Sequence, residues 1–353
     1  MRAIHKLSSV SIHSAIALMF GVLLLLTIAV ADAKAPPSQE WLPGLLEKDS
    51  LTIVITDSGL GGLSVVADAA RKFKKQGVFK DVELVFVNAL FRDGGGYNSL
   101  QTREGKLQVF SSALQSMQEQ YAPDIILVAC NTLSVLVPDT EFAKTSAVPV
   151  VGIVENGVDQ IAQQLGSDPA ARNIIFATQT TVDEATHKNG LLDLGYKDSQ
   201  VVTQSCPQLT LHIEQGYDSP YTEMLIDAYV DEALSSMGEL DAPLSVSFNC
   251  THFGYSLDFW KLAFESRGVK VDAYLDPNTK MIDFLLPEQY QNRFASSDVS
   301  VKVVSMIEIP SQSRESLGRY LHDISPATET ALQHYEQRTD LFKWQDLVAG
   351  PGG

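Results

Sequence analysis

The stretch "LTIVITDSGLGGLSVV" (residues 51–66) joins an apolar run to a glycine-rich turn and then to an amphipathic segment. Residues 51–56 have strand length and little polar alternation, which favours a strand buried on both faces. Gly59, Gly61 and Gly62 allow a tight turn and a close approach of backbone N–H groups to a ligand. A strand that passes through such a turn into a helix is the repeating unit of α/β proteins.

The same order recurs along the chain. We predict strands at residues 51–56, 82–87, 124–129, 148–154, 173–177, 200–203, 244–249, 269–274 and 299–304. We predict helices at residues 63–76, 99–121, 158–165, 221–237 and 255–267. This alternation predicts an α/β fold with mostly parallel sheets flanked by helices. Because 353 residues exceed what one hydrophobic core usually holds, we expect two lobes.

The first 33 residues have the order of a secretory signal peptide. Arg2 and Lys6 precede an apolar core at residues 15–30, and Ala31-Asp32-Ala33 has small residues at its outer positions. The core, about 16 residues, is shorter than a bilayer span of roughly 20. We therefore predict cleavage after Ala33 and export, to the periplasm. An uncleaved membrane anchor is the alternative.

The two flanks of the predicted fold are rich in helix-breaking residues. Pro36-Pro37 and Pro43-Gly44 predict an irregular lead-in over residues 34–50. Glycine and proline at residues 350–353 predict a tail over residues 346–353.

The formal net charge of the chain is −17 at neutral pH. Loss of residues 1–33 would make it about one unit more negative, since Arg2, Lys6 and Asp32 would go. Such a charge repels nucleic acids and anionic membrane surfaces, so we expect neither as a partner. Membrane contact is expected only through the N-terminal segment, if it is not cleaved. Any anionic substrate must then be held by local hydrogen-bond donors.

Two of the three cysteines stand where an apolar run ends. Cys130 follows the run in "VACNTLSV" (128–135), and Cys250 follows that in "PLSVSFNCTHFGY" (243–255). At the start of a helix a thiolate is favoured by the free N–H groups. His252 could orient or relay a proton. The alternative is a pair of ordinary core cysteines with a structural histidine. Because the count is odd, at least one thiol is expected to be free.

Other chemical schemes lack their motifs. The sequence has no Cys-x-x-Cys or His-x-x-x-His pair for zinc and no Gly-x-Ser-x-Gly elbow. The glycine turn after residue 56 fits neither the dinucleotide fingerprint nor the P-loop. In that turn Asp57 is either a helix cap or a carboxylate that polarises a nearby thiol.

The motifs "DSGLGG" (57–62), "ACNT" (129–132) and "NCTH" (249–252) appear in this order. Together they resemble the glutamate racemase branch of the aspartate/glutamate racemase family, over roughly residues 51–280. Weaker similarities are "VPVVGIVENGV" (148–158), "ATQTTV" (177–182) and "SCPQLTLHIEQG" (205–216). The resemblance implies two pseudo-symmetric α/β lobes with the active site in the cleft between them. The first would comprise residues 51–150 and 255–345, and the second residues 151–254.

The resemblance also implies a cofactor-independent amino-acid racemase, acting on glutamate or aspartate. One thiolate removes the α-proton and a thiol on the opposite face returns another, so no pyridoxal group and no metal is implied. Cys130 and Cys250 would be the acid/base residues, assisted by Asp57 and His252 respectively. The implied substrate-binding residues are Ser58, Asn131, Thr132, Thr251, Tyr97, Asn98, Thr178, Thr181 and Glu214. Cys206 is expected to be structural, and a homodimer is left open.

The sequence departs from the family in two places. In "VNALFRDGGGYNSL" (87–100) the family's Asp-Thr is replaced by Asn88-Ala89, and Tyr97-Asn98 follows three glycines. After the second cysteine motif, the family's Tyr-Pro is replaced by Phe253-Gly254. Two other functions stay open: an exported amino-acid-binding protein without catalysis, and a one-cysteine decarboxylase or isomerase on the same scaffold.

Overall fold

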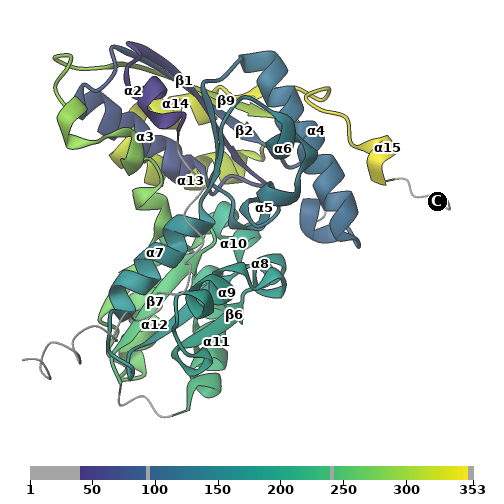
Figure 1. Cartoon of the computed structure of the whole chain (residues 1–353). Coiled ribbons are helices and arrows are strands. Elements are labelled where there is room, and N and C mark those ends of the chain that lie inside the picture. The colour runs from purple at the N-terminus through teal and green to yellow at the C-terminus, as the bar shows by residue number, and fades with distance from the viewer. Residues whose placement is uncertain (1–39, 93–95, 239–241, 349–353) are drawn as a thin grey trace, which may run out of the picture. The chain divides into compact units, whose positions relative to one another are not determined.

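The computed structural model describes residues 40–92, 96–238 and 242–348 (Figure 1). These residues fall within one compact unit. The predicted signal peptide and the predicted cleavage site after Ala33 lie outside the described residues, as does the end of the predicted tail. In the part of the chain that is described, no helix is both long enough and apolar enough to cross a bilayer.

The strands of the described residues form two sheets, and every pair of neighbouring strands is parallel. The first sheet has the order β10-β9-β2-β1-β3-β4 and the second has the order β6-β5-β7-β8. The first comprises β1 (Ser50–Asp57), β2 (Asp81–Asn88), β3 (Ile125–Val128), β4 (Val150–Gly152), β9 (Asp298–Ser305) and β10 (Glu336–Gln337). The second comprises β5 (Arg172–Ala177), β6 (Val201–Ser205), β7 (Leu244–Asn249) and β8 (Ala273–Leu275). The predicted α/β class is confirmed.

Helices connect the strands and cover the sheets (Figure 1). They are α2 (Leu42–Leu46), α3 (Leu63–Gln76), α4 (Arg103–Tyr121), α5 (Asn131–Ser134), α6 (Glu141–Thr145), α7 (Val154–Leu165), α8 (Gln179–Glu184), α9 (Thr186–Asp193), α10 (Leu209–Gly216), α11 (Pro220–Met237), α12 (Leu257–Ser266), α13 (Ser311–Ile324), α14 (Pro326–Gln333) and α15 (Gln345–Val348). Single 3₁₀ turns are η2 (Gly96–Ser99), η3 (Val137–Asp139), η4 (Asp198–Gln200), η5 (Phe253–Ser256), η6 (Pro277–Lys280), η7 (Asp283–Leu285) and η8 (Glu288–Tyr290).

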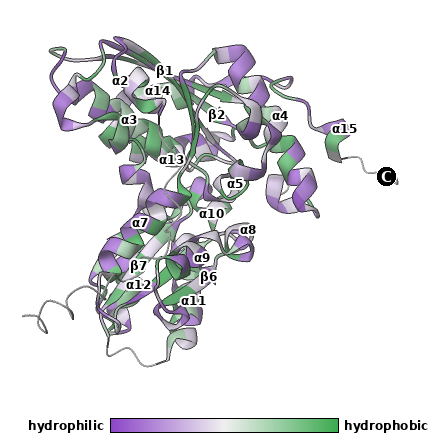
Figure 2. Cartoon of the chain, viewed as in Figure 1, coloured by the Kyte–Doolittle hydropathy of each residue, from purple (hydrophilic) through white to green (hydrophobic). Residues whose placement is uncertain are grey.

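The central strand β1 shows why the apolar runs fold as they do. Ile53 and Ile55 pack into one hydrophobic cluster, and Val54 packs into another. All three are fully buried, so the strand is covered on both faces, which is the arrangement that a continuous apolar run favours. The helices, by contrast, carry both hydrophobic and hydrophilic residues (Figure 2). In α3, for example, Phe73 is buried while the next residues are lysines.

The nine predicted strands are all present, with shifted ends. The run at residues 148–154 contributes only β4, because α7 already begins at Val154. The predicted irregular lead-in contains the short helix α2, which has Pro43 in its first turn and buries Leu45 and Leu46. Proline is tolerated there because its missing N–H would have no helical partner.

The division between the sheets does not coincide with the expected lobe boundary after residue 254. Strand β8 pairs with β7, so it extends the second sheet. Trp260 of α12 packs against Phe176 of β5 and Phe248 of β7, at ring-centre distances of 4.5 and 5.3 Å. These aromatic contacts keep α12 on the second sheet. The chain contributes to the first sheet again only from β9 onward.

Candidate active site

The first group of predicted site residues follows two neighbouring strands of the first sheet. Thr56 of β1 lies opposite Val128 of β3, so Asp57-Ser58 and Cys130 leave the sheet at the same edge. The hydroxyl of Ser58 lies 3.1 Å from the sulfur of Cys130. Functional groups gather at the carboxyl ends of strands in open α/β sheets, and these two strand ends follow that rule.

Asp57 and Cys130 are both buried, with exposed fractions of 1% and 5%. Burial raises the pKa of Asp57, although His252, Thr251 and Cys130 partly offset it. Burial also raises the pKa of the Cys130 thiol, and the nearby Asp57 charge adds to the effect. Cys130 is therefore held as a thiol, beside a carboxylate that accepts a proton more readily than an exposed one.

The second cysteine has its own acid/base partner. The Cys250 sulfur lies 3.7 Å from Nδ1 of His252, and Nε2 of His252 lies 2.8 Å from Oε1 of Glu214. The same Glu214 oxygen accepts a hydrogen bond from the backbone N–H of Leu60, at 2.9 Å. Burial alone would lower the pKa of His252, but the hydrogen bonds to Cys250 and Glu214 outweigh it and raise the pKa well above its ordinary value. His252 is therefore held as an imidazolium beside the Cys250 sulfur.

A direct hydrogen bond joins the residues around Cys130 to the residues around Cys250. Thr251, between Cys250 and His252, donates its hydroxyl to Oδ2 of Asp57 at 2.7 Å. The hydroxyl of Tyr255 also donates to the backbone carbonyl of Gly61, at 3.2 Å. The segment that follows the second sheet's strand β7 is thus anchored on the turn that follows β1.

The glycines of "DSGLGG" make this close approach possible. A Cβ atom on Gly61 would lie 2.3 Å from the Thr251 hydroxyl and 2.6 Å from Nδ1 of His252. A Cβ atom on Gly59 would lie 3.0 Å from Oε1 of Glu214. The turn therefore needs glycine because side chains of the second motif occupy the space where a methyl group would stand.

Replacement of Gly61 by alanine should thus destabilise the protein by roughly 1–3 kcal/mol, the usual cost of overpacking. It should also lower activity, because Thr251 and His252 must move. The matched control is Gly44→Ala, where no atom lies within 4 Å of the new Cβ. Urea unfolding of both variants measures the difference; equal stability of Gly61→Ala and the unmodified protein would show that the contact is not tight.

Three of the predicted threonines form a hydrogen-bonded row. The hydroxyl of Thr132 lies 2.7 Å from that of Thr178, which in turn lies 3.1 Å from that of Thr181. Thr178 follows β5, whose last residue pairs with Asn249 at the end of β7. The row therefore links the segment after Cys130 to the end of β5, which pairs with β7, the strand directly before Cys250.

Of the two predicted site residues in the 87–100 loop, Tyr97 is buried and Asn98 is exposed. Tyr97 is buried, packs edge-on against Phe91 at 5.1 Å, and shares a hydrophobic cluster with Cys130. Burial and the proximity of Cys130 raise the pKa of Tyr97, and its hydroxyl has no partner among the described residues. Asn98 is exposed, and its Oδ1 accepts a hydrogen bond from Thr180 of α8 at 2.6 Å. Tyr97 thus lies near Cys130, whereas the side chain of Asn98 bonds to α8.

Asn88, a departure from the family, has a structural role. Its amide donates to the Ser305 hydroxyl at 3.1 Å, and its Oδ1 accepts from the backbone N–H of Leu90 at 3.0 Å. Gly254, the other departure, faces Asp276, whose Oδ2 lies 2.2 Å from the position that a Cβ would take. The absence of a side chain at residue 254 therefore makes room for the Asp276 carboxylate.

Sequence reasoning missed His187 and Asn249. His187 in α9 is buried, and its Nε2 lies 3.1 Å from Oδ1 of Asn131. Asn249 is fully buried, and neither polar atom of its side chain has a partner among the described residues. Asn249 could have been noticed as the polar residue directly before Cys250. No local pattern marks His187.

All three cysteines are free and buried. The Cys206 sulfur lies 3.9 Å from the backbone carbonyl of Gln204. No group of three His, Cys, Asp or Glu side chains among the described residues could hold a metal ion.

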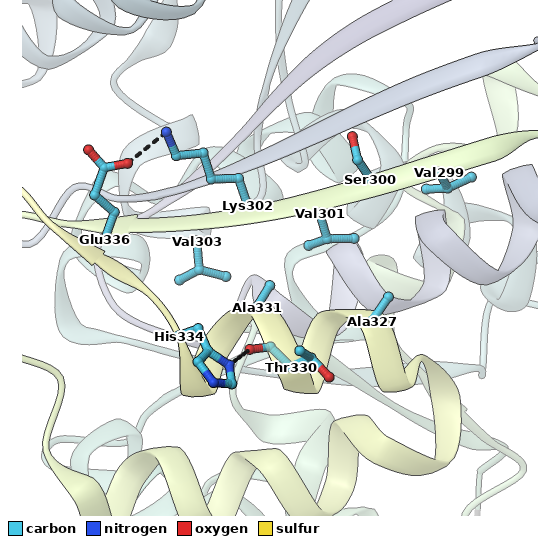
Figure 3. A pocket seen from close by; sticks show the side chains of 10 residues that line it. All are labelled: Val299, Ser300, Val301, Lys302, Val303, Ala327, Thr330, Ala331, His334 and Glu336. Atoms are coloured by element: carbon cyan, nitrogen blue, oxygen red, sulfur yellow. Dashed lines mark hydrogen bonds and ion pairs between the residues drawn. The ribbon is translucent and has the colours of Figure 1, made fainter.

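The hollow in Figure 3 does not coincide with the cysteines. It has a volume of about 570 Å³ and lies between β9 and α14, and Lys302 and Glu336 form an ion pair at its edge. None of the predicted site residues lines it. The outer edge of β9 pairs with β10 at only two residues, which leaves this space beside the strand.

The chain is similar in sequence to glutamate racemases. The chain is 24% identical over 204 residues to the glutamate racemase of Sulfurihydrogenibium sp., covering 58% of this chain and 71% of that one. It is 27% identical over 235 residues to that of Campylobacter concisus, covering 66% and 78%. No protein-family model matches the chain.

The fold is similar to that of a solved glutamate racemase as well. A crystal structure of glutamate racemase from Francisella tularensis, in complex with D-glutamate, superposes with a TM-score of 0.57 and 20% identity. The match covers 82% of this chain and 96% of that one. This chain is glutamate racemase-like. As a glutamate racemase-like protein it is an isomerase of the amino-acid racemase type.

Proposed function

We propose that this glutamate racemase-like protein racemises glutamate without a cofactor, by proton transfer between the α-carbon and two thiols, Cys130 and Cys250. The observation that carries the proposal is the matched environment of the two sulfurs. Each is buried at the carboxyl end of a strand, in a different sheet, and each has its own acid/base neighbour.

The two sulfurs have different neighbours. The raised pKa of Cys130 keeps a proton on its sulfur. The Nδ1 atom of His252 lies 3.7 Å from the Cys250 sulfur and can exchange a proton with it. With Cys250 as the base and Cys130 as the acid, the site can remove the α-proton on one face and return a proton on the other.

In the reaction, the Cys250 thiolate takes the α-proton of one enantiomer and leaves a carbanion stabilised by the substrate carboxylate. The Cys130 thiol then gives its proton to the opposite face, and the configuration is inverted. For the other enantiomer the roles exchange: Asp57 accepts the Cys130 proton, and the imidazolium of His252 supplies the Cys250 proton. Only bonds to hydrogen are made or broken, so the reaction needs no oxidant or co-substrate.

The hydroxyls and amides around the cysteines suit an amino acid's carboxylate group. Ser58, Thr132 and Asn131 can donate hydrogen bonds to the carboxylate. Donors of this kind stabilise the charge that develops on the carboxylate as the proton leaves. Glutamate is favoured because the similar proteins named above are glutamate racemases.

A racemisation screen tests this proposal. Each enantiomer of glutamate, aspartate and a set of neutral amino acids is incubated with the purified protein, without pyridoxal phosphate, and the products are separated on a chiral column. We expect both enantiomers of glutamate to be converted to the same mixture. Binding of an amino acid without conversion of any would instead favour the non-catalytic alternative. Export to the periplasm stays a prediction, since it depends on residues 1–33.

A further inference from the structure

A buried hydrogen bond ties His187 to a predicted substrate-binding residue. His187 lies in the first turn of α9 and is 2% exposed, and Asn131 is also 2% exposed. The two are joined by the contact of 3.1 Å between Nε2 of the ring and Oδ1 of the amide. Among the described residues, Nδ1 of His187 and Nδ2 of Asn131 are buried without a partner.

The charge state of His187 follows from its surroundings. Burial lowers its pKa to about 4, so the ring is neutral at physiological pH. A protonated ring would place both a charge and a second N–H in a site that offers only one acceptor. Neutral imidazole carries a single proton, and the position of that proton sets what the ring can offer to Asn131.

The proton belongs on Nε2. In that tautomer the ring donates to Oδ1 of Asn131, and the unpartnered atom is the Nδ1 lone pair. In the other tautomer Nδ1 would carry an N–H without a partner. A buried N–H without an acceptor is rarer in proteins than an unused acceptor, so the first tautomer is favoured.

This arrangement decides which end of the Asn131 amide is free. With Oδ1 engaged by the ring, the NH₂ group is the end left for another partner. A reversed amide would present its oxygen instead, and an oxygen would repel a substrate carboxylate. Because Asn131 directly follows Cys130, its orientation matters at the reacting centre.

We propose that His187 is a positioning residue: it fixes the side-chain amide of Asn131 so that the NH₂ group donates to the substrate carboxylate. The inference deepens the proposed function and rests on it. His187 itself does not touch the substrate in this account.

The packing around the ring supports a fixed position. A Cβ atom on Gly157 of α7 would lie 3.4 Å from Nε2 of His187 and 2.7 Å from Nδ2 of Asn249. Glycine at residue 157 thus lets the ring and Asn249 approach α7 closely. Asn249 directly precedes Cys250, so His187 lies in a polar cluster that adjoins both cysteine motifs, in which only a neutral ring is accommodated.

Three variants test whether the N–H donor of His187, and not only the size of its side chain, is needed. His187→Gln can place an amide N–H where Nε2 stands, His187→Asn places its N–H nearer the Nδ1 position, and His187→Phe keeps the ring without a donor. With glutamate as the probe, kcat/KM should fall about tenfold in the Phe and Asn variants, because the Asn131 amide is no longer held toward the carboxylate. The Gln variant should keep kcat/KM within about threefold of the unmodified protein. Equal kcat/KM values in Phe and Gln would overturn the proposal.

A second measurement needs no turnover. Proton–nitrogen correlation NMR of the unmodified protein, with the His187 ring assigned by through-bond correlation to its own backbone amide, shows which ring nitrogen carries the proton. Protonation at Nε2 is expected, and protonation at Nδ1 would overturn the proposal even if the variants fail to fold. If glutamate is not racemised but the proton is on Nε2, the proposed function fails while the hydrogen bond to Asn131 stands.

Discussion

Cys130→Ser and Cys250→Ser should each lower glutamate racemisation by about a thousandfold or more, in both directions. Removal of a positioned acid or base typically costs a factor of 10² to 10⁴. A serine hydroxyl is close to isosteric with the thiol but is far less acidic, so it cannot serve as the base at neutral pH. Because each direction uses one sulfur as base and the other as acid, neither variant should retain a fast direction.

Cys206→Ser is the matched control for this experiment. Cys206 is as deeply buried as the other two, with 1% of its surface exposed. Among the described residues, its sulfur has a hydrogen-bond contact with the backbone carbonyl of Gln204 and with no acid/base side chain. Its variant should keep racemisation within about threefold, and its thermal unfolding reports any general cost of a buried hydroxyl. Full activity in either Cys130→Ser or Cys250→Ser would mean that the two-thiol mechanism is wrong.

Glu214→Gln should lower racemisation by about a hundredfold at neutral pH and should move the alkaline limb of the pH profile to lower pH. The carboxylate of Glu214 helps to raise the pKa of His252. An amide at residue 214 removes that charge, so the pKa of His252 falls and the imidazolium is lost at a lower pH. Since a raised pKa preserves the charged form up to the folded-state pKa, its loss must appear on the alkaline side.

Glu265→Gln is a suitable control. Glu265 is exposed on α12, and its substitution removes the same charge at a distance from the cysteines. Its pH profile should match that of the unmodified protein. An alkaline limb that stays in place in Glu214→Gln would show that His252 does not depend on the carboxylate for its proton.

Much of the fold was predictable because strands at the centre of each sheet are buried on both faces. A strand such as β1, with Ile53, Val54 and Ile55 all fully buried, must be apolar throughout and is easily recognised. Strand β10 has two residues and carries no such signal. The boundary between the sheets could not be placed either, because the membership of α12 depends on the packing of Trp260 against rings far away in sequence.

The same distinction applies to the site. Asp57, Cys130 and Cys250 stand at strand ends in short motifs, which makes them recognisable in the sequence. The parallel register of β1 and β3 brings Asp57 and Cys130 to the same edge of the first sheet. His187 lies in an ordinary helical stretch, and only the fold places its ring 3.1 Å from Asn131. Asn98 belongs to a predicted site loop, and only the fold shows that its side chain accepts a hydrogen bond from Thr180.

The origin of the new α-hydrogen tests the two-thiol account most directly. L-Glutamate is converted in D₂O with the unmodified protein, and both enantiomers are separated at low conversion and analysed for deuterium. If Cys130 and Cys250 act from opposite faces, the D-glutamate formed should carry deuterium at the α-carbon while the remaining L-glutamate keeps its hydrogen. D-Glutamate that retains the original hydrogen would mean that a single base returns the proton it removed, and would contradict the account.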